Sequence, residues 1–177
     1  MKTISKIEDE GLWEDLPSLR VGRCWIFGAS DRLSKYESQL DGIMLPFLNQ
    51  WNAHGLGVEG AAAILYDRFL VIVQGMGGES VSGCSIDSMK NELSRFEKAT
   101  QVNLLEGSRI YWLSSTGEVV CADREGFKQA CRNGEVTGET EVFDTLIDQV
   151  ALLKPGRFLK PLKESWHARL YAAAQNS

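Results

Sequence analysis

The sequence predicts an α+β protein with a ferredoxin-like βαββαβ core and a C-terminal extension of a β-hairpin and helices. Two observations carry this prediction: short apolar or alternating segments typical of strands, and two helical apolar patterns that separate them in the order strand, helix, strand, strand, helix, strand. The core spans residues 20–115, an N-terminal arm precedes it, over residues 1–19, and residues 116–177 form an extension packed on the core. We expect a single domain for a chain of 177 residues.

The composition is typical of a globular protein and narrows the functional classes. Hydrophobic residues make up 44% of the chain and charged residues 24%. The 19 basic and 24 acidic side chains leave a net charge of −5, which argues against nucleic acid as a partner, because such binding needs a basic surface. The first residues hold no apolar run typical of an export signal, and no stretch approaches the length of a membrane span. We therefore expect a cytoplasmic protein with no membrane partner; composition leaves the oligomeric state open.

The cysteines and histidines do not form a pattern that binds metal. The four cysteines include no CxxC pair, and the chain has only two histidines. We expect reduced thiols, no metal and no cofactor, with Cys24 as a small core residue. The residues concerned are Cys24, Cys84, Cys121, Cys131, His54 and His167.

The first half of the chain predicts the elements of the core. A strand over residues 20–28 is followed by a helix that begins at Ser34, where Ser34 and Glu37 have capping-box spacing, and that Pro46 is expected to kink or split. A hairpin over residues 58–73 turns between Asp67 and Arg68, so that the numbers of paired residues sum to 135. The small residues 60–63 suggest close approach by another element.

The second half begins with a helix capped by Ser85, with Asp87 in its first turn and one apolar stripe formed by Ile86, Met89, Leu93 and Phe96. Strands over residues 109–114 and 118–121 flank a turn at residues 116–117. A helix over residues 123–132 follows, capped by Asp123 and ended by Gly134. Residues 141–153 predict another helix, and the tail becomes helical from residue 165. There Trp166 is expected to anchor the tail and His167 to lie on the surface.

The glycine-rich segment over residues 75–87, GMGGESVSGCSID, is the main candidate for a functional site. It leads directly into a helix, and the free amides of a helix N-terminus bind anions. The first hypothesis is therefore a binding domain for a small anionic ligand or an acidic group of a partner. The candidate binding residues are Ser82, Gly83, Ser85, Trp51 and Arg68.

A second hypothesis is an enzyme with a cysteine nucleophile. The predicted hairpin register and the βαββαβ connections both bring residues 51–55 (WNAHG) to residues 82–87 (SGCSID). His54 would then serve as base for Cys84, with Asp87 as a possible orienting group, since a helix N-terminus and an imidazolium both favour a thiolate. A third hypothesis is a structural or interaction protein, in which the glycines only shape a loop and the side chains only cap the helix.

The sequence excludes several nucleotide-binding and hydrolase classes. Gly78, Gly83 and Ser85 have the spacing of a P-loop, but Cys84 stands where the phosphate-binding lysine is required. No GxGxxG follows a strand with an acid suitably placed downstream, and no GxSxG elbow occurs.

Several segments together resemble an uncharacterised bacterial protein family: WNAHG, YDRF, SGCSID before a helix, VFDTLI and a late SWH. The resemblance spans about residues 25–166. Some members of that family are labelled ABC transporter ATPases, but this chain has neither the Walker lysine nor the Walker B acid and is too short for such a domain. The resemblance implies a soluble bacterial protein and brings no activity or catalytic residue with it.

Overall fold

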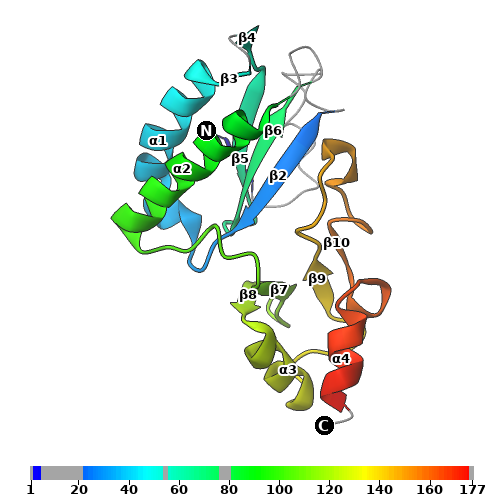
Figure 1. The fold of residues 1–177 in the computed structure, drawn as a ribbon. Helices are drawn as coiled ribbons and strands as arrows, with labels where there is room; N and C mark the ends of the chain where they lie inside the picture. The colour runs from blue at the N-terminus through cyan, green and yellow to red at the C-terminus, as the bar shows by residue number, and fades with distance from the viewer. Residues whose placement is uncertain (1, 5–21, 54–55, 76–80, 176–177) are drawn as a thin grey trace. The chain divides into compact units, whose positions relative to one another are not determined.

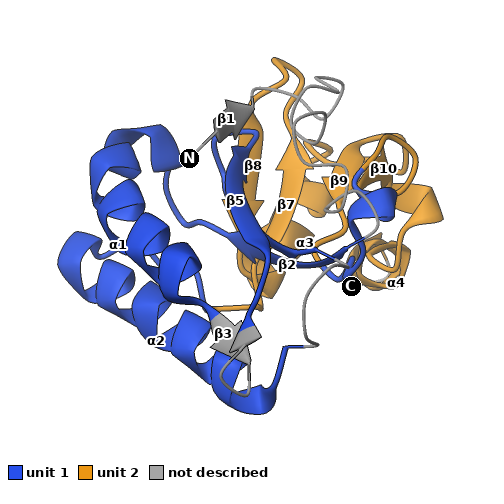
Figure 2. Ribbon diagram, turned by 90° about the horizontal axis from the view of Figure 1, so that it is seen from above, with its two compact units in different colours: residues 1–105, 146–153 blue, residues 106–145, 154–177 orange. Residues whose placement is uncertain are grey.

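The computed structural model describes residues 2–4, 22–53, 56–75 and 81–175. The chain forms two compact units, and each is described by itself (Figure 2). Unit 1 comprises residues 1–105 and 146–153, and unit 2 comprises residues 106–145 and 154–177. The boundary at residue 105 precedes the predicted end of the core by ten residues, and the organisation as one domain stays a prediction.

The sheet of unit 1 has the order β1-β5-β6-β2 (Figure 1). Its strands are β1 (Lys2–Ile4), β5 (Gly60–Leu65), β6 (Phe69–Gln74) and β2 (Arg23–Gly28). β6 lies between β5 and β2 and is antiparallel to both. All six residues of β6 are buried, which explains its continuous apolar sequence, because a central strand is covered on both faces.

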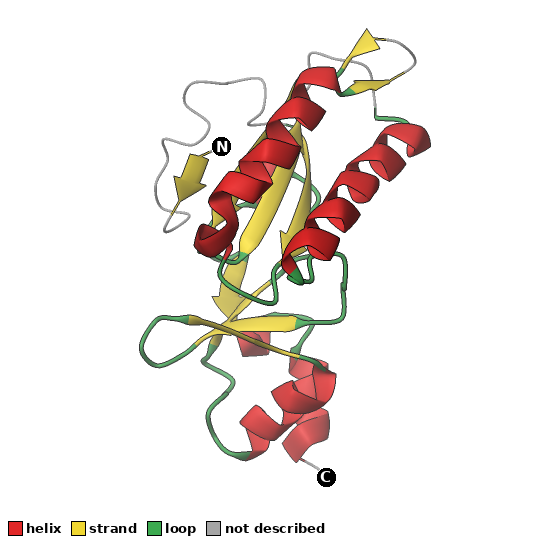
Figure 3. Ribbon diagram, turned by 90° about the vertical axis from the view of Figure 1, so that its left-hand side faces the viewer, coloured by secondary structure: helices red, strands yellow, loops and turns green. Residues whose placement is uncertain are grey.

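Two helices cover one face of this sheet (Figure 3). They are α1 (Glu37–Gln50) and α2 (Gly83–Thr100), and a 3-10 helix, η3 (Leu33–Tyr36), precedes α1. The predicted stripe of α2 is confirmed: Met89, Leu93 and Phe96 are fully buried, and Ile86 packs against the same cluster. The helices meet the sheet through a core that includes Leu40, Met44, Ile64, Leu70 and Ile72.

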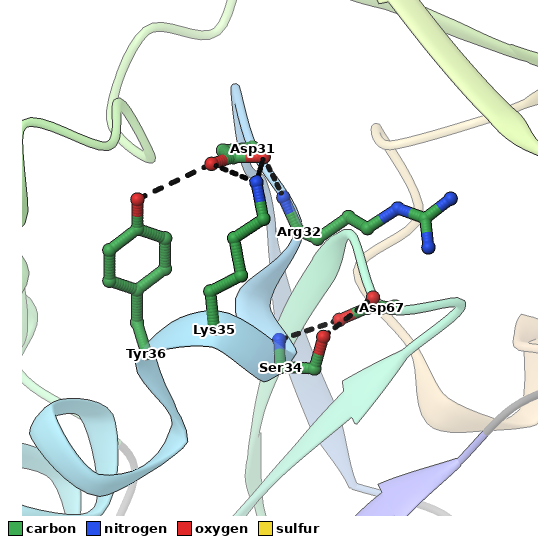
Figure 4. Close-up of polar contacts among 6 residues, drawn as sticks. All are labelled: Asp31, Arg32, Ser34, Lys35, Tyr36 and Asp67. Atoms are coloured by element: carbon green, nitrogen blue, oxygen red, sulfur yellow. Dashed lines mark hydrogen bonds and ion pairs between the residues drawn. The ribbon is translucent and has the colours of Figure 1, made fainter.

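The start of α1 differs from its prediction. Ser34 lies in η3 and bonds Asp67, not Glu37: its backbone N–H donates to Asp67 Oδ1 at 2.6 Å and its Oγ to Oδ2 at 2.9 Å (Figure 4). The acceptor that a capping box needs is therefore engaged by the β5–β6 turn. Pro46 does not split the helix, since α1 continues through it to Gln50, with only the Gly42 carbonyl deprived of its helical donor.

The β5–β6 hairpin forms with a register one residue away from the predicted one. Leu65 pairs with Phe69 and Gly60 with Gln74, so that paired numbers sum to 134. The turn has three residues because Tyr66 and Asp67 both adopt positive φ, at 52° and 55°. The ladder ends at Gly60, before which β3 (Asn52–Ala53) and β4 (Leu56–Gly57) pair with each other. The predicted pairing of His54 with Val81 lies outside the described residues, since His54 is not among them.

Unit 2 contains an antiparallel sheet of order β10-β9-β7-β8. The strands are β7 (Ile110–Leu113), β8 (Val119–Ala122), β9 (Glu141–Phe143) and β10 (Leu159–Pro161), and the helices are α3 (Arg124–Arg132), α4 (Ala168–Gln175) and the 3-10 helix η5 (Leu162–Glu164). Three local predictions are confirmed. Gly117 adopts φ 77° in the β7–β8 turn, Asp123 Oδ1 accepts the Gly126 N–H at 2.8 Å, and Gly134 follows α3 with φ 74°.

The fourth strand of the predicted core does not join the first sheet. β7 pairs with β8 and β9 in unit 2, while the free edge of β2 is met by residues 148–150. There the Cys24 N–H donates to the Asp148 carbonyl at 2.9 Å, and the Val150 N–H donates to the Gly22 carbonyl at 3.1 Å. The protein is therefore of mixed α and β structure with two mainly antiparallel sheets, and the ferredoxin-like arrangement is not confirmed.

The predicted helix over residues 141–153 is wrong. The segment forms β9 and then the 3-10 helix η4 (Val150–Leu152). Val142 and Phe143 are both buried although they are adjacent, and Leu146, expected on the apolar side of the helix, is 73% exposed. The segment also passes from unit 2 to unit 1 at residue 146, so its apolar residues serve two different cores.

Candidate functional site

A groove of about 620 Å³ runs between α1 and α2 and is the main candidate site in unit 1. The two helices are antiparallel because β2 and β6, the strands that precede them, are antiparallel. The end of α1 therefore lies beside the start of α2, where Trp51 and Ser82 both line the groove. The remaining lining residues are Gly42, Ile43, Pro46, Phe47, Gln50, Cys84, Ser85, Ser88, Asn91, Glu92 and Arg95.

The groove brings together part of the predicted site. Trp51 from the WNAHG segment meets Ser82, Cys84 and Ser85 from the SGCSID segment. The sequence did not indicate the rest of the lining along the two helices. The available signal was a polar stripe at helical spacing on α2, formed by Ser88, Asn91, Glu92 and Arg95, beside the buried apolar stripe.

The N-terminus of α2 begins one turn earlier than predicted. Ser82, not Ser85, is the N-cap: its Oγ accepts the Ser85 N–H at 3.3 Å and lies 2.9 Å from the Ser85 Oγ. The Ile86 N–H donates to the Ser82 carbonyl at 3.1 Å. The amides of Gly83 and Cys84, the first two residues of the helix, have no helical acceptor by geometry, and both residues are exposed. Cys84 lines the groove, whereas Gly83, a predicted binding residue, is not among the lining residues. This end of the groove therefore lies beside the positive end of an 18-residue helix.

Cys84 is exposed and is one of the residues that line the groove. Its carbonyl accepts a hydrogen bond from Ser88 Oγ at 2.9 Å, which fixes the local turn of α2. Asp87 is exposed, lies beyond the first turn and is not among the lining residues, so the structure does not place it as an orienting group at the groove. His54 lies outside the described residues, and its pairing with Cys84 stays a prediction.

Trp51 lines the groove at the C-terminal end of α1. It is only 4% exposed and packs against two other rings, edge-on to Trp25 at 5.9 Å and tilted against Phe47 at 5.3 Å between centroids. Its Nε1 is buried and has no hydrogen-bond partner within the described part of the chain. A buried N–H without an acceptor is unfavourable by about 1–3 kcal/mol.

The other end of the groove carries an ion pair. Arg95 Nη1 lies 2.8 Å from Glu92 Oε2, and their side chains are 70% and 27% exposed. Arg95 is the only cationic side chain among the lining residues. Eleven residues separate it from Cys84, which corresponds to about 16 Å along the helix axis. The groove is therefore elongated, with helix amides at one end and a neutralised charge pair at the other.

Arg68, the remaining predicted binding residue, is not in the groove. It precedes β6, whereas the end of the groove that holds Trp51 lies near the opposite end of that strand, where Gly60 pairs with Gln74. One guanidinium nitrogen of Arg68, Nη1, is buried without a hydrogen-bond partner in the part of the chain that is described. The structure thus separates Arg68 from the other candidates by the length of a strand.

A polar network surrounds the turn that precedes Arg68 (Figure 4). Lys35 Nζ contacts both Asp31 carboxylate oxygens at 2.9 Å, and Tyr36 Oη donates to Asp31 Oδ2 at 3.3 Å. Two hydrogen bonds lower the pKa of Asp31: the one from Lys35 has the largest effect, and the one from the Arg32 N–H comes second. All of these donors are satisfied by Asp31 and Asp67 within the network, which accordingly stabilises the turn.

The burial of Trp166 and His167, both in unit 2, is the reverse of the prediction. His167 is 2% exposed, whereas Trp166, expected to be the anchor, is 43% exposed and stacks on the His167 ring at 3.7 Å. Ser165 Oγ lies 3.2 Å from His167 Nδ1 and donates to the Leu162 carbonyl at 2.8 Å. Burial lowers the pKa of His167 to about 4, with smaller opposing effects from Asp144 and Lys160. This cluster holds the tail against α3, because His167 also packs on Phe127 at 6.1 Å.

No helix among the residues that the structure describes is long and apolar enough to cross a bilayer. No group of three or more histidine, cysteine, aspartate or glutamate side chains among them is arranged to hold a metal ion.

Comparisons with protein-family models, with curated proteins and with solved structures give no match for this chain. The resemblance to the bacterial family with WxAHG and SGCSID segments therefore stays an expectation from sequence. The class that the fold and groove define is an α+β protein with a ligand-sized groove between two helices, and function has to be argued from that groove.

Proposed function

We propose that the protein binds a small acidic ligand in the α1–α2 groove, with the acidic group at the N-terminus of α2. The observation that carries this proposal is that one groove gathers Trp51, Ser82, Cys84 and Ser85 beside the free amides of a long helix. The same proposal includes a cytoplasmic location. It also includes a relation of the core of unit 1 to ferredoxin-like proteins.

The chemistry of this end favours an acceptor. The Gly83 and Cys84 amides are donors, whereas the Ser82 hydroxyl already accepts from Ser85. No carboxylate lines this end, because Glu92 is the only acidic residue of the lining and belongs to the far pair. An anionic oxygen therefore meets donors and a favourable helix dipole without a nearby negative side chain.

The test is an NMR titration of ¹⁵N-labelled full-length protein with acetate and, separately, with inorganic phosphate. We expect saturable shifts of the Gly83 and Cys84 amides. The start of α3 is an internal control, since Arg124 and Glu125 also begin a helix but follow the Asp123 carboxylate, which repels anions. Equal, non-saturating shifts at α2 and α3 would contradict the proposal.

Three variants sharpen this test. Ser82→Asp keeps a capping side chain but places a negative charge at the site, and we expect it to abolish the saturable shift. Gly83→Pro removes one donor at the first helical position, where proline is well tolerated, and we expect weaker binding. Gly83→Ala keeps that N–H and has open space for its Cβ, so it should bind as the wild type does.

A second candidate function, a thiol enzyme, is favoured by one observation: Cys84 is exposed and lines this same groove. In acyl transfer, its thiolate would attack an ester carbonyl and expel the alkoxide, leaving a thioester on Cys84. The two functions separate through Cys84→Ser, which should retain acetate binding. A burst of p-nitrophenol from p-nitrophenyl acetate, with an acetyl adduct on the Cys84 peptide, would support the enzyme.

A further inference from the structure

We propose that the β8 edge of unit 2 pairs with the β8 edge of a second copy of this chain, so that two sheets join across a two-fold axis. The proposal concerns unit 2 and does not depend on the function proposed for the α1–α2 groove of unit 1. Three features carry it: an edge strand without protecting residues, backbone groups that point outward from that edge, and a register in which those groups are all free to pair.

The two edges of the unit 2 sheet differ in composition. In the order β10-β9-β7-β8, the edge strands are β10 and β8. β10 contains Lys160 and Pro161, and a lysine or a proline is a common means of preventing an edge strand from pairing with another chain. β8 has the sequence VVCA, with neither a charge nor a proline, and all four of its residues are half-buried. β8 is therefore the edge that stays suited to pairing.

The β7–β8 hairpin determines which backbone groups of β8 point outward. The Ser114 N–H donates to the Glu118 carbonyl at 2.9 Å, so these two residues form a hydrogen-bonded pair. Pair types alternate along an antiparallel ladder, so Val120 also bonds β7, whereas Val119 and Cys121 belong to pairs of the other type. The N–H and C=O groups of Val119 and Cys121 therefore point away from β7. The structure gives these groups no partner among the residues that it describes.

Self-pairing across this edge has a centred register. Val119 of one copy then pairs with Cys121 of the second copy, and each such pair exchanges both of its N–H···O=C bonds. The two-fold axis passes beside Val120, which faces Val120 of the second copy. A pair of β-branched side chains directly opposite each other stabilises a sheet. One strand thus supplies both halves of the interface, as a two-fold dimer requires.

Other registers are less favourable. A shift by one residue would bring outward groups of one copy to a residue whose groups already bond β7. A shift by two residues would recruit Gly117 or Asp123, which lie outside β8. The Gly117 N–H already donates to the Ser114 carbonyl at 2.9 Å, and the Asp123 carbonyl accepts the Phe127 N–H at 3.0 Å. Only the centred register forms its pairs entirely from β8 residues with both groups free.

The charges that flank β8 are compatible with this register. Glu118 precedes the strand and Asp123 follows it. In the centred register Glu118 lies opposite Ala122 of the second copy, and Asp123 lies opposite Gly117. Like charges directly opposite each other destabilise a sheet, and this pairing places none in that position.

The first experiment measures self-association of the full chain under reducing conditions. Sedimentation velocity should cover about 10 µM to about 1 mM, since an interface of one strand pair is small and weak. We expect a reversible monomer–dimer equilibrium without larger species, because the pairing uses the same edge of both copies. Amide hydrogen exchange should slow with concentration at Val119 and Cys121. The Val120 amide, bonded to β7 in each copy, should be protected at every concentration.

Val119→Pro removes an outward N–H and leaves the β7–β8 ladder bonds in place, and proline is tolerated at such an edge position. We expect self-association to weaken about tenfold or more, because by symmetry each copy loses a donor. The matched control is Val119→Thr, which keeps the N–H and the branched side chain and should associate within about twofold of the wild type.

Val120→Cys tests the register, in a background of Cys84→Ser and Cys121→Ser that removes the two thiols that are not buried. We expect a glutathione redox buffer to convert it to a disulfide dimer, since Cα atoms opposite each other in a non-hydrogen-bonded pair lie about 4.5 Å apart. The control is Ala122→Cys in the same background. Ala122 faces Glu118 of the second copy, so two residues at position 122 would be about 13 Å apart along the strands, too far for a disulfide.

Each outcome decides the proposal. A chain that stays monomeric at about 1 mM, with fast exchange at Val119 and Cys121, would overturn the second copy as the occupant of this edge and would leave it to a strand of another protein. A dimer that Val119→Pro leaves intact would use another surface. Equal disulfide formation by Ala122→Cys and Val120→Cys would contradict the register. Either of these results would also overturn the proposal.

Discussion

Trp51 lies against Gly60 so closely that a Cβ at residue 60 would be 2.7 Å from the indole Cε3. The same Cβ would be 3.2 Å from the Val73 carbonyl, so the glycine is confined between a ring and the neighbouring strand. This contact joins the end of α1 to β5 and fixes the position of Trp51, which lines the groove. The small residue at position 60 is thus required by packing, as its sequence context suggested.

We predict that Gly60→Ala destabilises the protein by about 1–3 kcal/mol, because the added methyl group must displace the indole or the backbone. It should also perturb the groove, seen as a changed environment of the Trp51 side-chain N–H. Chemical denaturation measures the first effect and NMR the second. Gly57→Ala is the matched control, since nothing lies within 4 Å of a Cβ there. Equal stability of the two variants would contradict the assigned contact.

We predict that Ser82→Ala lowers the free energy of unfolding by about 1 kcal/mol, since it removes the N-cap of α2 and the partner of Ser85 Oγ. Ser82→Asp, which keeps an acceptor and favours the helix dipole, should unfold close to the wild type. Ser88→Ala is the matched control one turn later; its Oγ bonds only the Cys84 carbonyl, so its loss should be smaller. If Ser82→Ala is as stable as Ser88→Ala, the cap is misassigned.

The sequence predicted local structure well where one element decides the outcome. The α2 stripe, the Asp123 cap and the Gly117 turn each depend on residues within a few positions of one another, and all three are confirmed. Prediction failed where a distant residue intervened. Ser34 has the spacing of a capping box, but Asp67, 33 residues away, takes its hydrogen bonds. Spacing alone contains no information about that competitor.

The candidate site shows the same division. The meeting of Trp51 with Ser82 and Cys84 was predicted, because the order of strands and helices fixes which connections share an end of the sheet. The predicted hairpin register was one residue off, since the positive φ of Tyr66 adds a residue to the turn. Apolar alternation does not reveal backbone conformation at a turn. The same hairpin prediction already put Arg68 at the end of the strand away from this site. It did not predict a role for Arg68 as a binding residue.

We predict that Cys84 is alkylated fastest of the four thiols in the folded protein. Cys84 is exposed, Cys121 is half-buried, and Cys24 and Cys131 are buried. Burial raises the pKa of the Cys24 thiol to about 12 and also raises that of Cys131. Both access and thiolate formation therefore oppose reaction at the buried sites. Iodoacetamide labelling at pH 8 with peptide mass spectrometry measures each rate. Modification of Cys24 as fast as Cys84 without unfolding would contradict the described burial.

We predict that His167 makes unit 2 sensitive to acid. Burial holds the folded-state pKa at about 4, below the ordinary value of 6.5, so between these values the unfolded chain binds a proton that the folded chain does not. The contribution of neutral His167 to the free energy of unfolding is complete above about pH 6.5, falls as the pH is lowered and is lost below about pH 4. The charged groups nearby are Asp144 and Lys160, which lie 2.8 Å apart as an ion pair and act on the pKa in opposite directions.

The span from 6.5 to about 4 corresponds to about 3 kcal/mol between neutral and acid conditions. Carboxylates titrate in the same range, so the informative quantity is the difference between the wild type and His167→Phe, which keeps a ring against Phe127 and Trp166. The variant loses the hydrogen bond to Ser165 and should be less stable at pH 7, yet its stability should decline less between pH 6.5 and 4. Urea denaturation at several pH values measures the decline. A histidine proton titration, assigned with His54→Ala, measures the pKa directly, and a His167 pKa near 6.5 would contradict its burial.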